Sequence, residues 1–179
     1  MKIFVTGSSG FIGFHLSKKL LEKGHNVHGF DSMNHYYDVK IKKARLKILS
    51  EYKKFSFTKS KLENKKILSR SILKFKPKVI VHLAAQAGVR YSIEKPRVYL
   101  DSNITGTYNI IELAKKVNIK HLLIASSSSV YGANKKLPFK ETDKTETQLS
   151  IYAATKKSTE SIAHSYSNIW KIPITMLRF

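Results

Sequence analysis

A glycine-rich turn between an apolar run and an amphipathic run, at the start of the chain, constrains the fold more than any other feature. The apolar run begins at Lys2 and predicts a buried strand, and the amphipathic run begins at Phe11 and predicts a helix. Gly7 permits a tight turn, Gly10 lets backbone N–H groups approach a pyrophosphate, and Gly13 lets helix and strand pack closely. The pattern predicts a helix whose N-terminus could hold a diphosphate, although a tight turn without a ligand would leave the same spacing.

An acidic residue follows the glycine-rich turn at a spacing that is typical of dinucleotide-binding sites. The first helix is expected at residues 11–23 and ends at Gly24. Its expected apolar side consists of Phe11, Ile12, His15, Leu16, Leu20 and Leu21. Asp31 closes the next apolar run, residues 25–30, at roughly the 20-residue distance where an acid meets an adenosine ribose. Because a carboxylate there binds the ribose hydroxyls and repels a 2′-phosphate, the spacing predicts NAD rather than NADP.

Length and composition limit the class of protein. Residues 1–179 are enough for one α/β domain and short for two. The chain has no cysteine, which excludes disulfides and thiolate metal sites and fits a reducing compartment. No apolar run approaches the ~18 residues of a membrane span, and the N-terminus lacks a signal-peptide cleavage pattern. We therefore expect a cytoplasmic protein without a membrane partner.

The strong positive charge raises the question of nucleic acid. The formal net charge is +21, with lysines concentrated in residues 40–78. Their spacing suits the solvated faces of two helices, at residues 40–52 and 62–75, and no groove-reading motif or aromatic stacking platform accompanies them. We expect no specific nucleic-acid partner and only weak adhesion at low salt.

Strand and helix patterns alternate along the rest of the chain. Further strands are expected at residues 55–58, 79–83 and 121–125, a further helix at 96–117, and a polar loop at 86–92. This alternation predicts an α/β fold, a Rossmann-type doubly wound parallel sheet that binds ligands at the carboxyl ends of its strands. Those ends bring together the glycine loop, Asp31, residues 84–86 and residues 126–129. The small residues Ala84 and Ala85 suit a flat cofactor and close helix packing equally well.

A phenol and an ammonium lie one helical turn apart in the last predicted helix. Tyr152 and Lys156 are four residues apart, which places both side chains on one face. A nearby ammonium favours the phenolate, so Tyr152 would accept a proton from an alcohol whose carbon gives a hydride to NAD. Ser127, after the preceding strand, would orient that alcohol. Tyr-x-x-x-Lys is also common on helix surfaces, and serine clusters are common in loops. The hypothesis therefore depends on the combination of Ser127 with Tyr152 and Lys156.

Longer motifs carry a family resemblance over the whole chain. They are Thr-Gly-x-x-Gly-Phe-Ile-Gly at residues 6–13, Asp31, Ser-Ser-Ser-Ser-Val-Tyr-Gly at 126–132 and Tyr-Ala-Ala-Thr-Lys at 152–156. Together they resemble an extended short-chain dehydrogenase/reductase. Residues 31–38, 82–92 and 177–179 are most similar to the UDP-glucuronate 4-epimerases of that superfamily.

The resemblance implies a site and a chemistry. The implied catalytic residues are Ser127, Tyr152 and Lys156, with Tyr152 as the base. The implied NAD-binding residues are Gly7, Gly10, Phe11, Ile12, Gly13, Asp31, Asn34, Leu83, Ala84, Ala85, Gln86, Asn103, Tyr152 and Lys156. The implied substrate-binding residues are Ala87, Gly88, Val89, Arg90, Ser127, Ser128 and Ser129. No metal is implied; the partner is a UDP-sugar of polysaccharide biosynthesis, and a homodimer is expected for the full-length form.

Neighbouring families differ just before Val130-Tyr131-Gly132. Nucleotide-sugar 4,6-dehydratases carry an Asp-Glu pair there and UDP-glucuronate decarboxylases usually a Glu, whereas this chain has Ser128 and Ser129. Hydroxyls cannot replace that acid, but they can donate hydrogen bonds to a sugar carboxylate. The resemblance therefore favours a UDP-glucuronate 4-epimerase, with UDP-glucose 4-epimerase as the alternative enzyme.

Two departures from the family pattern affect what is expected. Lys61 stands where the family usually has an aspartate near the adenine, which weakens the expected affinity for NAD. Family members continue beyond Phe179 into a C-terminal substrate lobe, so this chain is expected to be the cofactor half with that lobe missing. An inactive NAD-binding fragment is accordingly an alternative.

Overall fold

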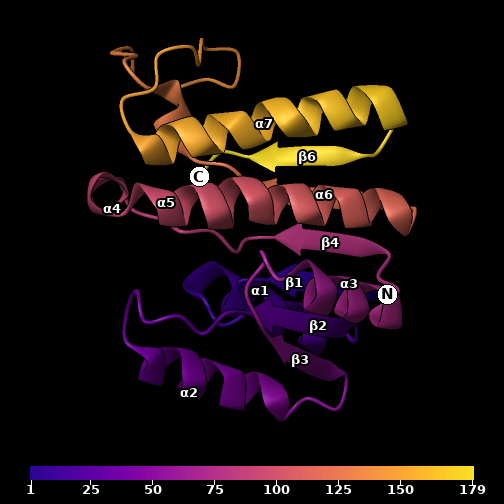
Figure 1. The fold of residues 1–179 in the computed structure, drawn as a ribbon. Coiled ribbons are helices and arrows are strands. Elements are labelled where there is room, and N and C mark those ends of the chain that lie inside the picture. Colours follow the sequence, from indigo (N-terminus) through magenta and orange to yellow (C-terminus); the bar gives the residue numbers. More distant parts are fainter.

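The computed structural model describes residues 1–179 as one parallel sheet with helices on both faces (Figure 1). The strands are β1 (Lys2–Thr6), β2 (Asn26–Asp31), β3 (Phe55–Lys59), β4 (Val79–His82), β5 (His121–Ala125) and β6 (Ile174–Leu177). The helices are α1 (Phe11–Glu22), α2 (Val39–Ser50), α3 (Lys65–Phe75), α4 (Val89–Glu94), α5 (Pro96–Tyr99), η1 (Leu100–Thr105), α6 (Gly106–Lys116), η2 (Ser128–Tyr131) and α7 (Ile151–Trp170). The strand order β3-β2-β1-β4-β5-β6 is that of a Rossmann fold, which confirms the expected fold class.

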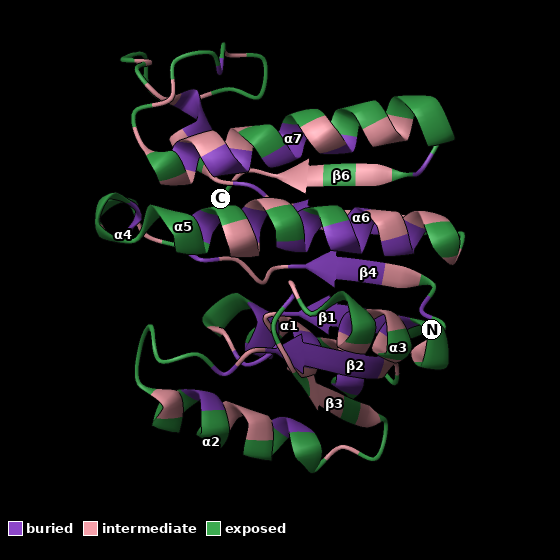
Figure 2. Cartoon of the chain, viewed as in Figure 1, coloured by how far each residue is buried: buried purple, intermediate pink, exposed green.

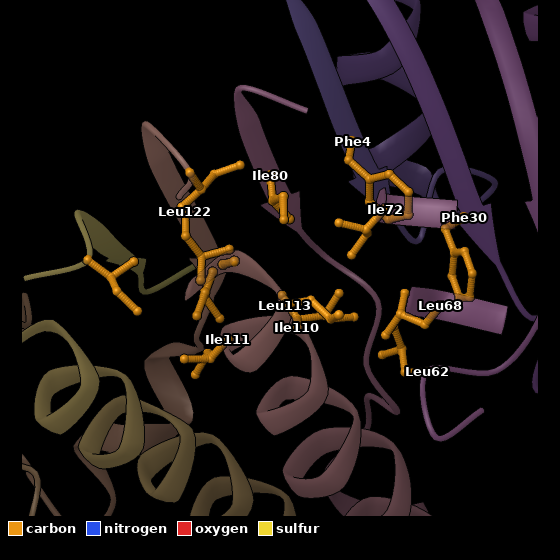
Figure 3. Close-up of a cluster of buried hydrophobic side chains, with 14 of the residues drawn as sticks. Phe4, Phe30, Leu62, Leu68, Ile72, Ile80, Ile110, Ile111, Leu113 and Leu122 are labelled. Atoms are coloured by element: carbon orange, nitrogen blue, oxygen red, sulfur yellow. The ribbon is translucent and has the colours of Figure 1, made fainter. Parts of the chain in front are cut away.

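Alternate side chains of the strands enter two separate cores. On one face, Phe4, Ile80 and Leu122 pack under α3 and α6 (Figure 3). On the other face, Ile3 and Val81 pack with residues of α1 and α2. Figure 2 shows the consequence: β2 is buried almost throughout, whereas β3, at one edge of the sheet, is only partly buried. None of the helices has the length and apolar character that crossing a membrane requires.

Local sequence signals explain where the helices begin. The side chain of Asp38 accepts a hydrogen bond from Lys40 N at 2.8 Å, Asn64 from Ile67 N at 3.1 Å, and Ser150 from Ala153 N at 3.0 Å. These residues are the N-caps of α2, α3 and α7. The helix α1 has no such cap, because its N-cap is Gly10.

The glycine loop is built as the spacing predicts. Gly7 has a φ of +70°, which a glycine adopts without strain. A Cβ at Gly13 would lie 2.1 Å from Gly7 O, so α1 can approach the end of β1 only because Gly13 has no side chain. Gly24 follows α1 with a φ of +78°, as expected.

Several element boundaries differ from expectation. The helix α3 begins at Lys65 rather than at residue 62, because Leu62 instead packs against Gly106 and its carbonyl accepts from Asn109 Nδ2 at 3.1 Å. The expected polar loop 86–92 contains the start of α4. The strand β6 was not expected at all.

The predicted apolar side of α1 was right for Leu16, Leu20 and Leu21, which belong to or pack against the core on that face, and wrong for the first turn. Phe11 and Ile12 are 67% and 45% exposed, and His15 is exposed too. The side that packs on the sheet consists of Gly13, Phe14, Ser17 and Leu21. Neighbouring elements decide this orientation, because small residues at Gly13 and Ser17 allow the closest approach.

The long helix expected at residues 96–117 is one continuous run through α5, η1 and α6. Its middle, Leu100–Thr105, is π-helical, a feature that often marks functional sites. This turn carries the buried residue Asn103.

Candidate active site

A cavity of about 450 Å³ lies at the carboxyl ends of β1, β2 and β4. Its lining includes the predicted residues Gly7, Gly10, Asp31, Asn34, Leu83, Ala84, Ala85, Gln86 and Ala87. Tyr36, Tyr37, Lys42 and Lys61 also line it. The structure therefore gathers segments that are far apart in the sequence at one crevice, where ligands of doubly wound sheets bind.

The N-terminus of α1 has the features of a diphosphate site. The first hydrogen bond at this end runs from Phe14 N to Gly10 O at 3.0 Å, which leaves the N–H groups of residues 11–13 without an acceptor in the chain. A Cβ at Gly10 would lie 3.1 Å from Gly7 O, so a side chain would crowd this turn. The buried Ser9 hydroxyl also has no partner. Free N–H groups and the helix dipole favour an anion here, and these residues fit a dinucleotide pyrophosphate.

Asp31 is buried at the end of β2 and is held by the glycine loop. Its Oδ2 accepts from Ser9 N at 3.1 Å, and its Oδ1 accepts from Met33 N at 2.8 Å. Lys42 Nζ lies 3.8 Å from Oδ1 and donates to Asn34 Oδ1 at 2.8 Å. The carboxylate is thus fixed in orientation beside the cavity, where a ribose would lie.

A buried histidine supports the floor of the crevice. Thr6 Oγ1 accepts from Leu83 N and Ala84 N, at 3.1 and 3.0 Å, so its own hydrogen must go to His82 Nδ1 at 2.8 Å. His82 then carries its proton on Nε2 and donates it to Thr107 Oγ1 at 3.0 Å. This series of hydrogen bonds fixes the backbone of residues 83 and 84, which line the cavity.

Acid is expected to destabilise the fold through two histidines. Burial, aided by nearby lysines, lowers the pKa of His82 to about 3 and that of His28 to about 4. Because the unfolded chain binds these protons near pH 6.5, stability is complete above that pH and falls as the pH drops towards 4. The free energy of unfolding, measured by urea denaturation between pH 7 and 5, should fall by up to about 1.4 kcal/mol per pH unit for each histidine.

Single substitutions separate the contribution of each histidine to the pH dependence of stability from that of other titrating groups. His82→Gln should remove about half of the pH dependence between pH 7 and 5. The exposed residue His35 provides the matched control, and His35→Gln should leave the slope unchanged. A free energy of unfolding that does not vary between pH 7 and 5 would contradict the assignment.

Two of the predicted catalytic residues, Ser127 and Lys156, lie at the end of β5, and Tyr152 precedes Lys156 by one turn of α7. Lys156 is 6% exposed and its Nζ donates to Ala125 O at 2.8 Å. Burial lowers the pKa of Lys156 to about 8. Tyr152 is half-buried one turn earlier on α7, with its ring edge-on to Tyr99 at 6.1 Å between centroids. Ser127 follows β5, and its Oγ accepts from Ser129 N at 3.2 Å.

The predicted substrate segment is held from two sides. Tyr99 is fully buried, and its hydroxyl lies 2.7 Å from Ala87 O and 2.6 Å from Gly88 O, so its single hydrogen is donated to one of these carbonyls or shared between them. A Cβ at Gly88 would lie 2.3 Å from Tyr36 OH, so the loop after β2 touches the loop after β4. The backbone of residues 87 and 88 is therefore fixed, while Val89 and Arg90 are exposed.

The side chain of Asn103, which the family resemblance implies as a cofactor ligand, binds the loop after β4. Its Oδ1 accepts from Gln86 N at 2.7 Å, and its Nδ2 donates to Gln86 O at 3.0 Å and to Thr155 Oγ1 at 3.1 Å. Asn103 does not line the cavity. Its amide connects the loop after β4 to α7.

A salt-bridged network lies one turn beyond Lys156 on α7, and the sequence did not indicate it. The buried Glu160, one turn after Lys156, accepts from Arg178 Nε and Nη2, both at 2.9 Å, and from Ser126 Oγ at 2.6 Å. It joins the ends of β5 and β6 to α7. A second cavity, of about 960 Å³, lies beside this network and is lined in part by Ser128.

Lys42 was missed as well, because the lysines of α2 were interpreted as a solvated face. The side chain of Lys42 is only 7% exposed. Lys42, Leu46 and Leu49 are spaced as one side of a helix, but Ile41, Arg45 and Ile48 have the same spacing, and both isoleucines are exposed. The spacing alone therefore does not indicate which side of α2 is buried.

The fold and the site together define an extended short-chain dehydrogenase/reductase of the nucleotide-sugar epimerase and dehydratase class. The chain belongs to the family described as GDP-mannose 4,6 dehydratase, whose model matches residues 4–179.

Individual relatives narrow the similarity. A probable UDP-glucuronate 4-epimerase of Rhizobium meliloti (strain 1021) is 50% identical over 179 residues, covering 100% of this chain and 52% of the relative. Protein CapI of Staphylococcus aureus is 55% identical over 179 residues, covering 53% of the relative. The crystal structure of UDP-glucuronic acid 4-epimerase from Bacillus cereus, in complex with UDP-glucuronic acid and NAD, is similar with a TM-score of 0.92 and 34% identity, over 99% of this chain and 56% of that one. The chain spans about half the length of the curated relatives it matches.

Proposed function

We propose that residues 1–179 form the NAD-binding domain of an NAD-dependent 4-epimerase that interconverts UDP-glucuronate and UDP-galacturonate. The observation that carries this proposal is the arrangement at the end of β5, where buried Lys156 donates to Ala125 O and Tyr152 lies one turn away on α7. The similarity to UDP-glucuronate 4-epimerases supports the choice of substrate.

The chemistry assigned to the chain is proton transfer and orientation. Tyr152, as phenolate, takes the proton of the sugar C4 hydroxyl, and Ser127 holds that hydroxyl in place. The Lys156 ammonium favours the phenolate, and this help is lost as the pH rises above the lysine pKa of about 8. NAD, when bound, supplies the acceptor and donor of the hydride. Inversion follows when the 4-keto sugar presents its other face and Tyr152 returns the proton.

NAD would be held by the groups around the crevice. The free N–H groups at the start of α1 suit the pyrophosphate, and Asp31 suits the adenosine ribose. Leu83 to Gln86 would lie along the nicotinamide side, and Asn103 would act through Gln86. The exposed Lys61 remains a reason to expect modest affinity at the adenine.

Ser128 and Ser129 are proposed to bind the sugar carboxylate. Changing both to alanine, in a polypeptide that carries residues 1–179 together with a substrate lobe, should raise KM for UDP-glucuronate about 10-fold or more. One hydrogen bond to a charged group contributes roughly 1.5–3 kcal/mol, and neutral ones contribute less. KM for UDP-glucose should change much less. Coupled assays with both substrates measure the difference.

The two substrates also distinguish the alternative enzyme. UDP-glucose 4-epimerase is supported by a Thermotoga maritima structure with UDP-glucose, which is 30% identical with a TM-score of 0.88. Equal losses for both substrates would mean that the serines only shape the loop. A wild-type preference for UDP-glucose would assign the function to a UDP-glucose 4-epimerase. Absence of turnover in a polypeptide that includes a substrate lobe would favour an inactive NAD-binding fragment.

A homodimer is part of the proposal for the full-length form. The outer sides of α6 and α7 expose Tyr108, Ile169 and Trp170, which are 41%, 62% and 46% accessible. Exposed apolar groups on adjacent helices suit an interface. A cytoplasmic location stays a prediction from the sequence.

A further inference from the structure

Lys42 is a buried cation beside the carboxylate that would select the cofactor. Its Nζ lies 3.8 Å from Asp31 Oδ1, 2.8 Å from Asn34 Oδ1 and 4.7 Å from the centre of the Tyr37 ring. It is the only lysine of α2 that is buried. The structure thus places a positive charge at the point where an adenosine ribose would meet Asp31.

The charge balance of this subsite differs from what Asp31 alone implies. Arg45, one turn after Lys42, reaches Ser9 O and Tyr37 OH with Nη1, both at 3.4 Å. One carboxylate and two cations therefore lie at the glycine loop, and the carboxylate already accepts two backbone hydrogen bonds. Repulsion between Asp31 and a 2′-phosphate is too simple an account of cofactor choice here.

Lys42 depends on Asp31 for its counter-charge. Burial lowers the pKa of Lys42, the Asp31 carboxylate opposes this effect, and Arg45 lowers the pKa further. A buried ammonium without a counter-ion is costly. If the Asp31 charge were removed, a phosphate on the ribose O2′ would be the nearest substitute, since it can accept from both cations.

We propose that Lys42 is a second residue that selects the cofactor. While its ammonium is paired with Asp31, Lys42 donates to the ribose hydroxyls of NAD. When the Asp31 charge is removed, Lys42 and Arg45 donate to the 2′-phosphate of NADP. The inference rests on the proposed NAD site. In this proposal Asp31 neutralises the charge of Lys42 and also binds the ribose.

The test is calorimetric titration of the 179-residue chain with NAD and with NADP. The wild-type chain should bind NAD more tightly. Asp31→Asn keeps the shape of the side chain, and it should weaken NAD and tighten NADP, each about 10-fold, the effect expected of one charge-assisted hydrogen bond. Adding Lys42→Met to Asp31→Asn should abolish the gain for NADP. The NADP affinity of Asp31→Asn should also fall steeply with added KCl, because the new contact is ionic.

Matched variants distinguish the proposed role of Lys42 in cofactor selection from effects on folding and from the effect of removing any positive charge. Lys43→Met removes an exposed lysine from the same helix and should leave both affinities unchanged. Lys42→Met alone keeps Asp31 and should weaken NAD several-fold, with an unchanged far-UV circular dichroism spectrum. If the double variant binds NADP as tightly as Asp31→Asn, or if Asp31→Asn gains nothing for NADP while still folded, the proposal is overturned. Failure of the proposed NAD site gives a distinct result, since the wild-type chain would then bind neither cofactor.

Discussion

Tyr152→Phe is expected to slow 4-epimerisation by about 10²–10⁴-fold, in a polypeptide that carries residues 1–179 together with a substrate lobe. Phenylalanine keeps the ring and its edge-on contact with Tyr99, so packing on α7 should be preserved. The lost hydroxyl is the group that takes the C4 proton. Conversion of UDP-glucuronate to UDP-galacturonate, followed by chromatography of the nucleotide sugars, measures the effect.

NAD binding and a second tyrosine serve as controls. Tyr152→Phe should leave NAD bound, with at most a small loss of affinity from the missing hydroxyl, because the proposed loss is chemical. Tyr108→Phe changes an exposed tyrosine on α6, away from the crevice, and should not alter turnover. Near-normal turnover of Tyr152→Phe would remove Tyr152 from the mechanism, and complete loss of NAD binding would point to a structural role.

Glu160→Ala is expected to lower the free energy of unfolding by about 3 kcal/mol. Burial alone would raise the pKa of the Glu160 carboxyl, but hydrogen bonds from Arg178 and Ser126 and the charges of Arg178 and Lys157 hold that pKa below its usual range. Truncation leaves the Arg178 guanidinium, whose side chain is 21% exposed, without its carboxylate. Urea denaturation at pH 7 measures the loss.

A more exposed ion pair provides the comparison. Glu112 pairs with Lys115 at 2.8 Å, with side chains 26% and 33% exposed, and also accepts from Tyr166 OH. Glu112→Ala should cost less than about 1 kcal/mol, because solvent screens such pairs. Equal costs for the two variants would mean that the Glu160 network adds nothing beyond an ordinary surface pair.

Much of the fold could be predicted from the sequence because its signals are local. Apolar runs separated by helical patterns specify strands and helices, and the caps Asp38 and Asn64 mark helix starts through hydrogen bonds to residues two or three positions away. The roles of Gly7 and Gly13 were also predictable, because a turn and a close approach both exclude a side chain. The carboxyl ends of the strands then indicated where the candidate site lies.

The errors arose where neighbouring elements decide the outcome. Phe11 and Ile12 are apolar but exposed, because small residues on the other side of α1 pack closer to the sheet. Leu62 fits a helical pattern but lies outside α3, where Gly106 leaves room for it. Periodicity describes one element alone and contains no information on the surface that it meets.

The sequence by itself indicated most of the strands and helices, the glycine loop and the catalytic candidates Ser127, Tyr152 and Lys156, since these signals are residue types and spacings within short segments. Only the tertiary structure decided which buried polar groups become partners. The structure pairs Asp31 with Lys42 and Glu160 with Arg178, and it connects His82 to the first strand. The physical reason is that a buried charge or imidazole is stabilised by whatever group the packing of elements brings within hydrogen-bonding distance, and sequence separation does not restrict that choice.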